Sequence, residues 1–293
     1  MIDKLELLIA LARERHFGKA AESCGISQPT LSAAVKSIEE QLGVLIVERG
    51  SRFRGFTPEG ERVLDWARRI VGDVRTMRQE IKGLRHGLTG TLRLGVIPTA
   101  LPFVPELSMP FMDRHPAVHL SIVSRSTGMI LSALDNLEID IGITYIDIEP
   151  LQRFQTLRLY AERYVLLVAP DHPLAKRKTM TWADANKVPL CLLTTDMQNR
   201  RIIDSHLSDA GELVQPVLES NSMTMLHVHV QSGRVATIAA LGEGERFDPP
   251  FNLTALPMVE PDVTHEIGLV LKAREPHPPH VAAFLAYARR RAR

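Results

Sequence analysis

Apolar residues recur along the chain in two different patterns, and the change between them divides the sequence near residue 90. Residues 1–57 hold short helical patterns rich in Ala, Leu and Glu, and residues 58–85 form one unbroken helical run. Farther on, apolar runs of strand length alternate with helical stretches; these runs are Leu92–Ile97, Val118–Ser124, Ile139–Tyr145, Tyr164–Ala169, Pro189–Leu193, Val235–Ala240 and Ile267–Leu271. Such alternation predicts α/β units around a mainly parallel sheet.

The sharpest local pattern lies near the N-terminus. Ala21, Gly25 and Leu31 stand at offsets 0, 4 and 10. A helix-turn-helix needs this spacing, because a small residue lies where the helices cross, a glycine makes the turn, and an aliphatic residue anchors the second helix. Ser27 is placed to cap that second helix and Gly43 to end it. The alternative is an ordinary three-helix domain with a solvated face.

The second helix of this motif has two distinct faces. At about 100° per residue, its aliphatic residues fall on one stripe that we expect to face the core; they are Leu31, Val35, Ile38 and Leu42. Small polar groups at the start of the opposite face suit the base edges of a DNA major groove. The candidate DNA contacts of this helix are Gln28, Pro29, Thr30, Ser32 and Lys36.

A basic turn bounded by glycines follows the helix. It carries Arg49, Arg52 and Arg54. On a two-stranded wing, these charges would reach backbone phosphates or an adjacent minor groove. A solvated run of charge is the alternative, but the neighbouring helix-turn-helix favours DNA contact.

A long helix is predicted to begin at Thr57-Pro58-Glu59, since Thr caps, Pro fits the first turn and an acid suits the N-terminal dipole. Its apolar residues recur at spacings of 3, 4, 4, 3, 4 and 3; they are Val63, Trp66, Ile70, Val74, Met77, Ile81 and Leu84. At 1.5 Å per residue the helix is roughly 40 Å long. A seam of this length predicts dimerisation with a second copy. The alternative is a helix that lies on its own domain.

Composition adds little to this picture. The chain has 45% hydrophobic and 24% charged residues and a net charge of +1, so charge alone does not indicate a nucleic-acid partner. Residues 1–87 hold 15 basic and 12 acidic residues, a balance of +3, and the rest balances at −2. The sequence lacks a signal-peptide pattern and an apolar run long enough to span a membrane, so we expect a cytoplasmic protein without membrane contact.

The reactive side chains do not form a recognisable catalytic or metal-binding pattern. Cys24 and Cys191 are far apart and are expected to be reduced, without spacing that supports a thiol switch. His227 and His229, in a stretch that also has two methionines, are two residues apart on a predicted helix and do not face each other. We therefore expect no metal, no cofactor and no enzymatic activity. A solute-binding protein is a further alternative, which the first 85 residues argue against.

Several segments together resemble the LysR-type transcriptional regulators. They are Phe17–Ala21, Ile26–Ser32, Ile38–Gly43, Phe56–Gly60, Leu92–Gly95, Asp140–Ile143 and Asp171–Leu174. The resemblance covers essentially the whole chain, and its N-terminal signature is long and specific. This sequence departs from the family pattern at Ala33 and Ala34, where many relatives have Arg and Gln, at Val47 in place of Phe, and near residue 240, where the usual Pro is missing.

The resemblance implies a fold and an assembly. The expected fold is α/β with an N-terminal winged helix-turn-helix over residues 1–57, a linker helix and hinge over 58–90, and a periplasmic-binding-protein-like effector domain over 91–293. Its subdomain I would comprise residues 91–162 and 267–293, and its subdomain II residues 163–266. The implied protein is a homodimer that forms a homotetramer and binds double-stranded DNA at an inverted-repeat operator.

The resemblance also implies an effector site between the two subdomains, where loops follow the strands. The matching residues are Thr99, Ala100, Ser126, Thr127, Thr144, Thr194 and Met197. Thr99 and Thr127 each precede a predicted helix, so their hydroxyls and nearby N–H groups are suited to a carboxylate or another anion; plain helix capping is the alternative. The expected function is regulation of transcription by a small anionic effector that shifts the shape of the tetramer and its operator contacts.

Overall fold

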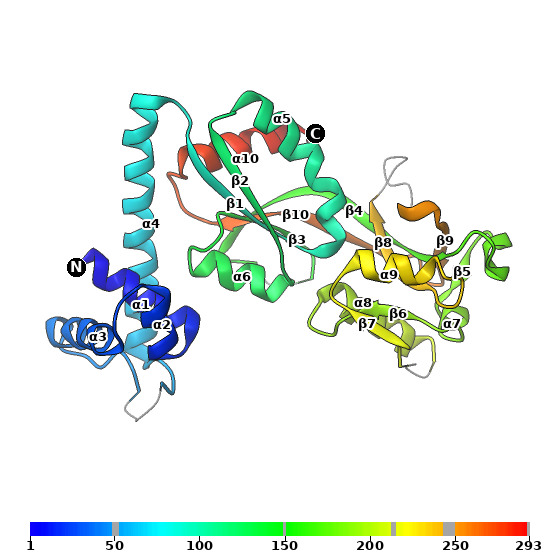
Figure 1. The fold of residues 1–293 in the computed structure, drawn as a ribbon, viewed down its shortest axis with the longest axis horizontal. Helices are drawn as coiled ribbons and strands as arrows, with labels where there is room; N and C mark the ends of the chain where they lie inside the picture. The colour runs from blue at the N-terminus through cyan, green and yellow to red at the C-terminus, as the bar shows by residue number, and fades with distance from the viewer. Residues whose placement is uncertain (49–52, 149–150, 212–214, 243–249, 292–293) are drawn as a thin grey trace.

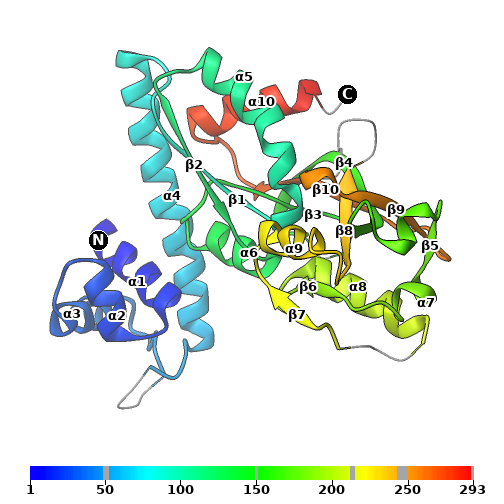
Figure 2. The same ribbon diagram turned by 45° about the vertical axis from the view of Figure 1, so that its right-hand side comes forward.

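A computed structural model describes residues 1–48, 53–148, 151–211, 215–242 and 250–291. The small helical N-terminal domain lies at one end of a long helix, and an α/β half lies beside the helix (Figure 1). This half has two subdomains, of which the first is nearer to the long helix, and Figure 2 shows the same order from another side. In the described part of the chain, no helix is both long enough and apolar enough to cross a membrane.

In their described residues, the N-terminal domain and the long helix comprise four helices. They are α1 (Ile2–Glu14), α2 (Phe17–Ser23), α3 (Gln28–Leu42) and α4 (Pro58–His86). Ala21 and Leu31 are buried, and Gly25 has a φ of +67°, as the helix-turn-helix spacing predicts. Leu42 is 51% exposed, so the prediction that it faces the core is wrong. The last turn of α3 extends beyond the apolar cluster that α1, α2 and α4 form.

Side-chain caps define where the helices of this domain begin. The Ser27 hydroxyl accepts the Thr30 N–H at 3.3 Å, and the Thr57 hydroxyl accepts the Gly60 N–H at 2.9 Å. Gly60 has to lack a side chain, because a Cβ there would lie 2.0 Å from the Ile46 carbonyl oxygen. The chain between α3 and α4 is therefore held tightly against the start of α4.

The first subdomain is built on the strands that follow α4 and on the C-terminal helix. Its elements are β1 (Gly90–Val96), η1 (Pro98–Phe103, a 3-10 helix), α5 (Val104–Arg114), β2 (Val118–Ser124), α6 (Thr127–Asp135), β3 (Ile141–Tyr145), β10 (Thr264–Lys272) and α10 (Pro279–Arg291). Strand β4 (Phe154–Val168) is shared with the second subdomain.

The second subdomain lies at the far end of β4. Its further elements are η2 (Pro173–Lys176), β5 (Met180–Thr181), α7 (Trp182–Ala185), β6 (Cys191–Leu193), α8 (Gln198–Asp209), β7 (Leu218–Ser220), α9 (Met223–Val230), β8 (Thr237–Gly242), η3 (Pro250–Asn252) and β9 (Thr254–Val259). The sequence pattern did not predict β5, β7 and β9, and of β4 it predicted only the last third, from Tyr164 onward.

The strands form a mixed sheet, so the expectation of a mainly parallel sheet is wrong. The strand order is β2-β1-β3-β10-β4-β9-β5, with β8 also paired to β4, and β6 and β7 form a separate pair. β1 is parallel to β2 and β3, whereas β10 is antiparallel to β3 and β4. The physical reason is the chain path: β4 leads from the first subdomain to the second, and β10 returns in the opposite direction.

The two subdomains meet where β4 changes its pairing partners. Up to Arg163, β4 pairs with β10, and from Glu162 onward it pairs with β8. His265 of β10 lies opposite Glu162. These residues form the hinge of the molecule, since they are the place where β4 and β10 pass between the subdomains.

Candidate functional site

Helix α3 presents a polar face to solvent. Its predicted DNA contacts are all exposed; they are Gln28, Pro29, Thr30, Ser32 and Lys36. The opposite face is buried through Leu31, Val35 and Ile38. The Lys36 Nζ lies 3.6 Å from the Glu40 carboxylate one turn along, so its charge stays at the surface. An outward helix with hydroxyl and amide groups at its N-terminal end suits a DNA major groove.

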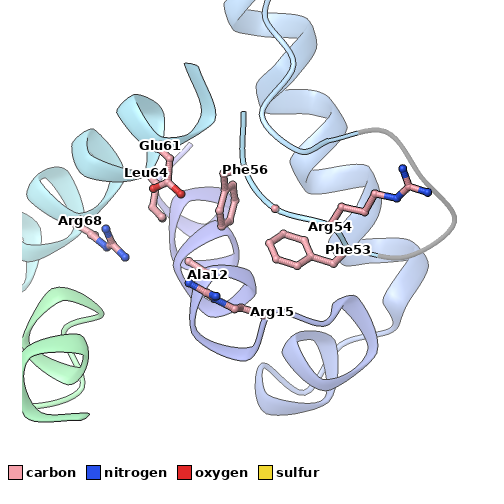
Figure 3. Close-up of a pocket in the computed structure, with 9 residues that line it drawn as sticks. Ala12, Arg15, Phe53, Arg54, Phe56, Glu61, Leu64 and Arg68 are labelled. Atoms are coloured by element: carbon pink, nitrogen blue, oxygen red, sulfur yellow. The ribbon is translucent and has the colours of Figure 1, made fainter. Parts of the chain in front are cut away.

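Of the three arginines predicted for the wing, one lies in the described residues. Phe53 packs edge-on against Phe56, with ring centroids 5.2 Å apart. The adjacent Arg54 is exposed (Figure 3). Arg49 and Arg52 lie outside the described residues. Between the wing, α1 and the first turns of α4 is a cavity of about 400 Å³ (Figure 3).

Helix α4 has two apolar sides. Leu64, Ala67 and Val71 are buried against the N-terminal domain. The predicted dimerisation seam lies on another side, where Val63 and Val74 are half-buried. The rest of the seam is exposed by 40% or more; it consists of Trp66, Ile70, Met77, Ile81 and Leu84. The described part of a single chain therefore leaves most of this seam uncovered.

The predicted effector residues of the first subdomain are buried at the ends of three strands. Thr99 and Ala100 lie in η1 after β1, Ser126 and Thr127 begin α6 after β2, and Thr144 lies near the end of β3. The Thr127 and Thr144 hydroxyl oxygens are 2.9 Å apart and hydrogen-bond to each other. Thr99 lies inside η1 and does not cap it.

The second subdomain contributes a loop between β6 and α8. The Met197 N–H donates to the Thr194 carbonyl at 3.0 Å, and the nearly buried Arg200 donates to the Leu193 carbonyl at 2.8 Å. Arg200 also pairs with Asp204 at 2.7 Å. The loop is thus firmly held, yet the Thr194 hydroxyl is buried without a hydrogen-bond partner among the described residues.

A buried carboxyl group lies between these two sets of residues. The Tyr145 hydroxyl donates to Glu162 Oε2 at 2.9 Å, and the Tyr160 hydroxyl donates to Glu162 Oε1 at 3.3 Å. From the second subdomain, Asn199 Nδ2 donates to the Tyr145 oxygen at 3.3 Å. We call Thr99, Tyr145, Tyr160, Glu162 and Asn199 the hinge network, because it joins both subdomains at the hinge.

The hinge network perturbs the titration of its carboxyl group. Burial raises the pKa of Glu162 to about 7, its hydroxyl neighbours lower this pKa in part, and the charge of Asp147 adds to the rise. The Thr99 hydroxyl completes no hydrogen bond of good geometry among the described residues, although it lies close enough to Glu162 to affect this pKa. Near neutral pH, Glu162 therefore exists in both its charged and its neutral form.

Sequence reasoning missed Tyr160, Glu162 and Asn199. Glu162 carried no clear signal, because it stands next to Arg163 and just before the apolar run Tyr164–Ala169. Asn199 carried none, because its contact with Tyr145 depends on how two separate subdomains meet.

The cysteine and histidine side chains have structural surroundings. Cys191 is fully buried, and burial raises the pKa of its thiol to about 11, whereas Cys24 caps the end of α2 in the other domain. His227 is buried, and the Nδ1 of His229 lies 2.8 Å from the Met225 carbonyl oxygen. Among the residues described, three or more His, Cys, Asp or Glu side chains do not gather anywhere in a metal-binding group.

Two family models match successive parts of the chain. Residues 2–61 match the bacterial regulatory helix-turn-helix protein of the lysR family, and residues 85–293 match the LysR substrate binding domain. The chain belongs to the LysR family. This LysR protein is a DNA-binding transcriptional regulator with an effector-binding domain, and the predicted family, fold class and general function are confirmed.

The LysR chain is similar to characterised regulators over nearly its full length. It is 29% identical over 279 residues to the DNA-binding transcriptional dual regulator OxyR of Escherichia coli (strain K12), covering 94% of this chain and 90% of OxyR. A full-length OxyR variant from Pseudomonas aeruginosa is 26% identical with a TM-score of 0.71, covering 100% of this chain and 99% of that one. CbnR, a LysR family regulator solved with its target DNA, is 20% identical with a TM-score of 0.59 over 99% of each chain, and shows the same fold.

Proposed function

We propose that this LysR regulator responds to a small anionic effector that binds between its two subdomains. The observation that carries the proposal is a pair of buried hydroxyls that complete no hydrogen bond of good geometry with the described residues, namely Thr99, which lies beside Glu162 and Tyr145, and Thr194 of the other subdomain. Buried polar groups nearly always have hydrogen-bond partners, so such hydroxyls are available to a ligand. The other members of the proposed site are Ala100, Ser126, Thr127, Thr144 and Met197.

Glu162 sets the charge of this proposed site. Its ionised form repels an effector carboxylate, so the effector binds together with a proton on Glu162. The affinity for a carboxylate then falls about tenfold for each pH unit above pH 7. An uncharged effector has no such dependence, which distinguishes the two ligand classes.

The proposed operator contacts come from paired DNA-binding domains. The exposed apolar seam of α4 supports a homodimer, and two dimers form the proposed homotetramer on an inverted repeat. The proposed contacts are Gln28, Pro29, Thr30, Ser32, Lys36, Arg49, Arg52 and Arg54. We assign DNA binding to residues 1–57, dimerisation and the junction between the linker helix and the effector domain to 58–90, and effector binding to 91–293.

A peroxide signal acting on a thiol is the competing function, since relatives such as one from Escherichia coli O157:H7 are named hydrogen peroxide-inducible genes activators. Peroxide reacts with accessible thiolates. Cys191 is fully buried, and its pKa of about 11 keeps it protonated, so it is poorly suited to this chemistry. We infer a non-covalent effector. Cys191→Ser should leave operator binding before and after peroxide treatment the same as in the unchanged protein.

A thermal-shift screen of small carboxylates at pH 6 and pH 8 tests the effector site. We expect a ligand that stabilises the protein more at pH 6, because a bound ligand stabilises the native state by mass action. Thr99→Ala should lose this response and still bind the operator in a gel shift. Thr156→Ala, on the exposed surface of β4, is the matched control and should respond normally. A normal response of Thr99→Ala would show that the site assignment is wrong.

A further inference from the structure

A second cavity, of about 230 Å³, lies between α4 and the first subdomain, on the side of that subdomain away from the hinge network. Both walls carry positive charge. Arg68 and Arg69 come from α4, and Arg153, Lys272 and Arg274 come from the ends of β4 and β10. The cavity therefore brings together five cations from segments that are far apart in the sequence.

The carboxylates of the cavity balance only part of this charge. Asp65 and Asp135 are the acidic residues that line it. Asp135 pairs with both Lys272 and Arg153, the latter at 2.8 Å, so it neutralises at most one of the two. Asp73, outside the lining, pairs with Arg274 at 3.2 Å, so three carboxylates act on five cations and leave an excess of about two positive charges.

Two of the cations have unused hydrogen-bonding groups. The Arg69 guanidinium lies over the Trp66 ring, with 5.2 Å from its central carbon to the ring centroid, and forms no ion pair with the described residues. The Nε of Arg68 is buried and has no hydrogen-bond partner among them. The exposed Arg69 guanidinium is free to bind a ligand that supplies negatively charged oxygen atoms.

Burial makes the excess charge unfavourable. The side chains of Arg68, Lys272 and Arg274 are only 17%, 28% and 24% exposed. Burial lowers the pKa of Lys272, although its partner Asp135 acts in the opposite direction. The charges of Arg68 and Arg153 lower this pKa further. Like charges that repel each other in a partly buried cavity are stabilised when an anion enters.

We propose that this cavity binds a small polyanion, either a phosphate compound or a polycarboxylate with at least two negative charges. Guanidinium groups match phosphate and carboxylate oxygens in paired hydrogen bonds. The cavity is smaller than the ~300–1,000 Å³ typical of drug-sized ligands, which favours a compact ion. It is a separate site from the proposed effector site at the hinge.

The position of the cavity gives this ligand a mechanical effect. Arg68 donates to the Asn136 side-chain oxygen at 3.0 Å and Arg75 to the Leu137 carbonyl at 3.1 Å, so α4 and the first subdomain already touch beside the cavity. A polyanion held by arginines of both walls adds a further link. It fixes the first subdomain to the helix that carries the DNA-binding domain.

Isothermal titration of the full chain with pyrophosphate, and separately with citrate, tests the proposal. The ionic strength is held constant with sodium chloride. We expect one saturable site per chain, with binding at least fivefold weaker in Arg69→Gln and in Arg153→Gln. Arg69 is exposed and Arg153 has a side chain that is 67% exposed, so both variants should fold, which their melting temperatures verify. Tighter binding of pyrophosphate would indicate a phosphate ligand, and tighter binding of citrate a polycarboxylate.

Two controls separate this cavity from other basic surfaces. Arg114→Gln, at an exposed position of the first subdomain, and Arg54→Gln, on the wing, should bind as the unchanged protein does. Unchanged affinity in both cavity variants would overturn the proposal. An equal loss in Arg54→Gln would also overturn it, because the binding would then be assigned to the DNA-contacting face. So would an equal binding heat when sodium chloride is titrated in place of pyrophosphate or citrate.

Discussion

Replacing Glu162 with glutamine removes one titrating group from the hinge and keeps nearly the same shape. Tyr145 and Tyr160 contact the two carboxyl oxygens at 2.9 and 3.3 Å. In the glutamine, the single amide oxygen can accept from one tyrosine, and the amide N–H can donate to the hydroxyl oxygen of the other. The substitution therefore separates the effect of the charge from the effect of packing. Its consequence is a change in how the stability of the protein depends on pH.

The size of this change follows from the pKa of Glu162, which is about 7 in the folded protein against an ordinary value of 4.5. Below pH 4.5 the carboxyl is protonated in both states, and between pH 4.5 and 7 it ionises chiefly in the unfolded chain. Rising pH in this window therefore lowers the free energy of unfolding. One pKa unit corresponds to ~1.4 kcal/mol, so we expect a loss of about 2–3 kcal/mol between pH 5 and 8.

Denaturant unfolding of both proteins at pH 5 and pH 8 measures this loss. The stability of Glu162→Gln relative to the unchanged protein should rise by about 2–3 kcal/mol from pH 5 to pH 8, because other titrating groups cancel in the comparison. Glu266→Gln is the control, since Glu266 forms an exposed ion pair with Arg158 and should change stability by less than about 1 kcal/mol. Equal pH dependence of Glu162→Gln and the unchanged protein would refute the assignment of a raised pKa to Glu162.

Three further substitutions test the DNA-binding half. Ile70→Glu places a charge in the exposed seam of α4 and should give monomers in light scattering. Lys82→Glu, on another side of the helix, should stay dimeric. A dimeric Ile70→Glu would contradict the assignment of this seam to the dimer interface. Lys36→Gln should weaken operator binding. If Lys36 contacts a phosphate, the slope of log K for operator binding against log salt concentration should also become less steep by about 1. An unchanged slope in a gel-shift titration would exclude that contact. Leu31→Ala should lower the free energy of unfolding by about 2–5 kcal/mol in urea, because Leu31 is fully buried, and a loss below 1 kcal/mol would contradict its role as anchor.

The DNA-binding half could be predicted because its signals are local. Ala21, Gly25 and Leu31 lie within a short segment, and each takes the structural role that its spacing indicates. The caps at Ser27 and Thr57 are also local, since each hydroxyl binds an N–H three residues later. Leu42 shows the limit of periodicity: it lies on the right stripe, but α3 extends past the core at that point.

The hinge network could not be predicted because its contacts join distant segments. Glu162 meets Tyr145 from another strand, and Asn199 reaches Tyr145 from the other subdomain. The pairing of Glu162 with His265 depends on the register between β4 and β10, which no local spacing encodes. For the same reason, the pattern of apolar runs indicated strands but did not reveal that two of them cross between subdomains in opposite directions.

Strand β10 runs from the hinge toward the linker helix α4. Arg274, just beyond the end of β10, makes the contact with α4. The strand has nine residues, a length of roughly 30 Å, and is paired on both sides by β3 and β4, so it is stiff. Just beyond its end, Arg274 donates to the Asp73 carboxylate at 3.2 Å and to the Arg69 carbonyl at 3.3 Å. Its guanidinium lies over Gly72, where a Cβ would be only 1.9 Å away.

Weakening this contact should uncouple the effector domain from α4 without altering the proposed effector residues or DNA contacts, although Arg274 also lines the cavity of the five cations. Arg274→Ala removes the guanidinium, and Gly72→Ala displaces it by steric contact, so both variants should show faster hydrogen exchange in the middle of α4 and a larger maximum dimension in small-angle scattering. Arg290→Ala, at the exposed end of α10, is the control. Because two different perturbations act on the same contact, exchange and dimensions that stay unchanged in both would rule out Arg274 as the connection between the hinge and the DNA-binding half.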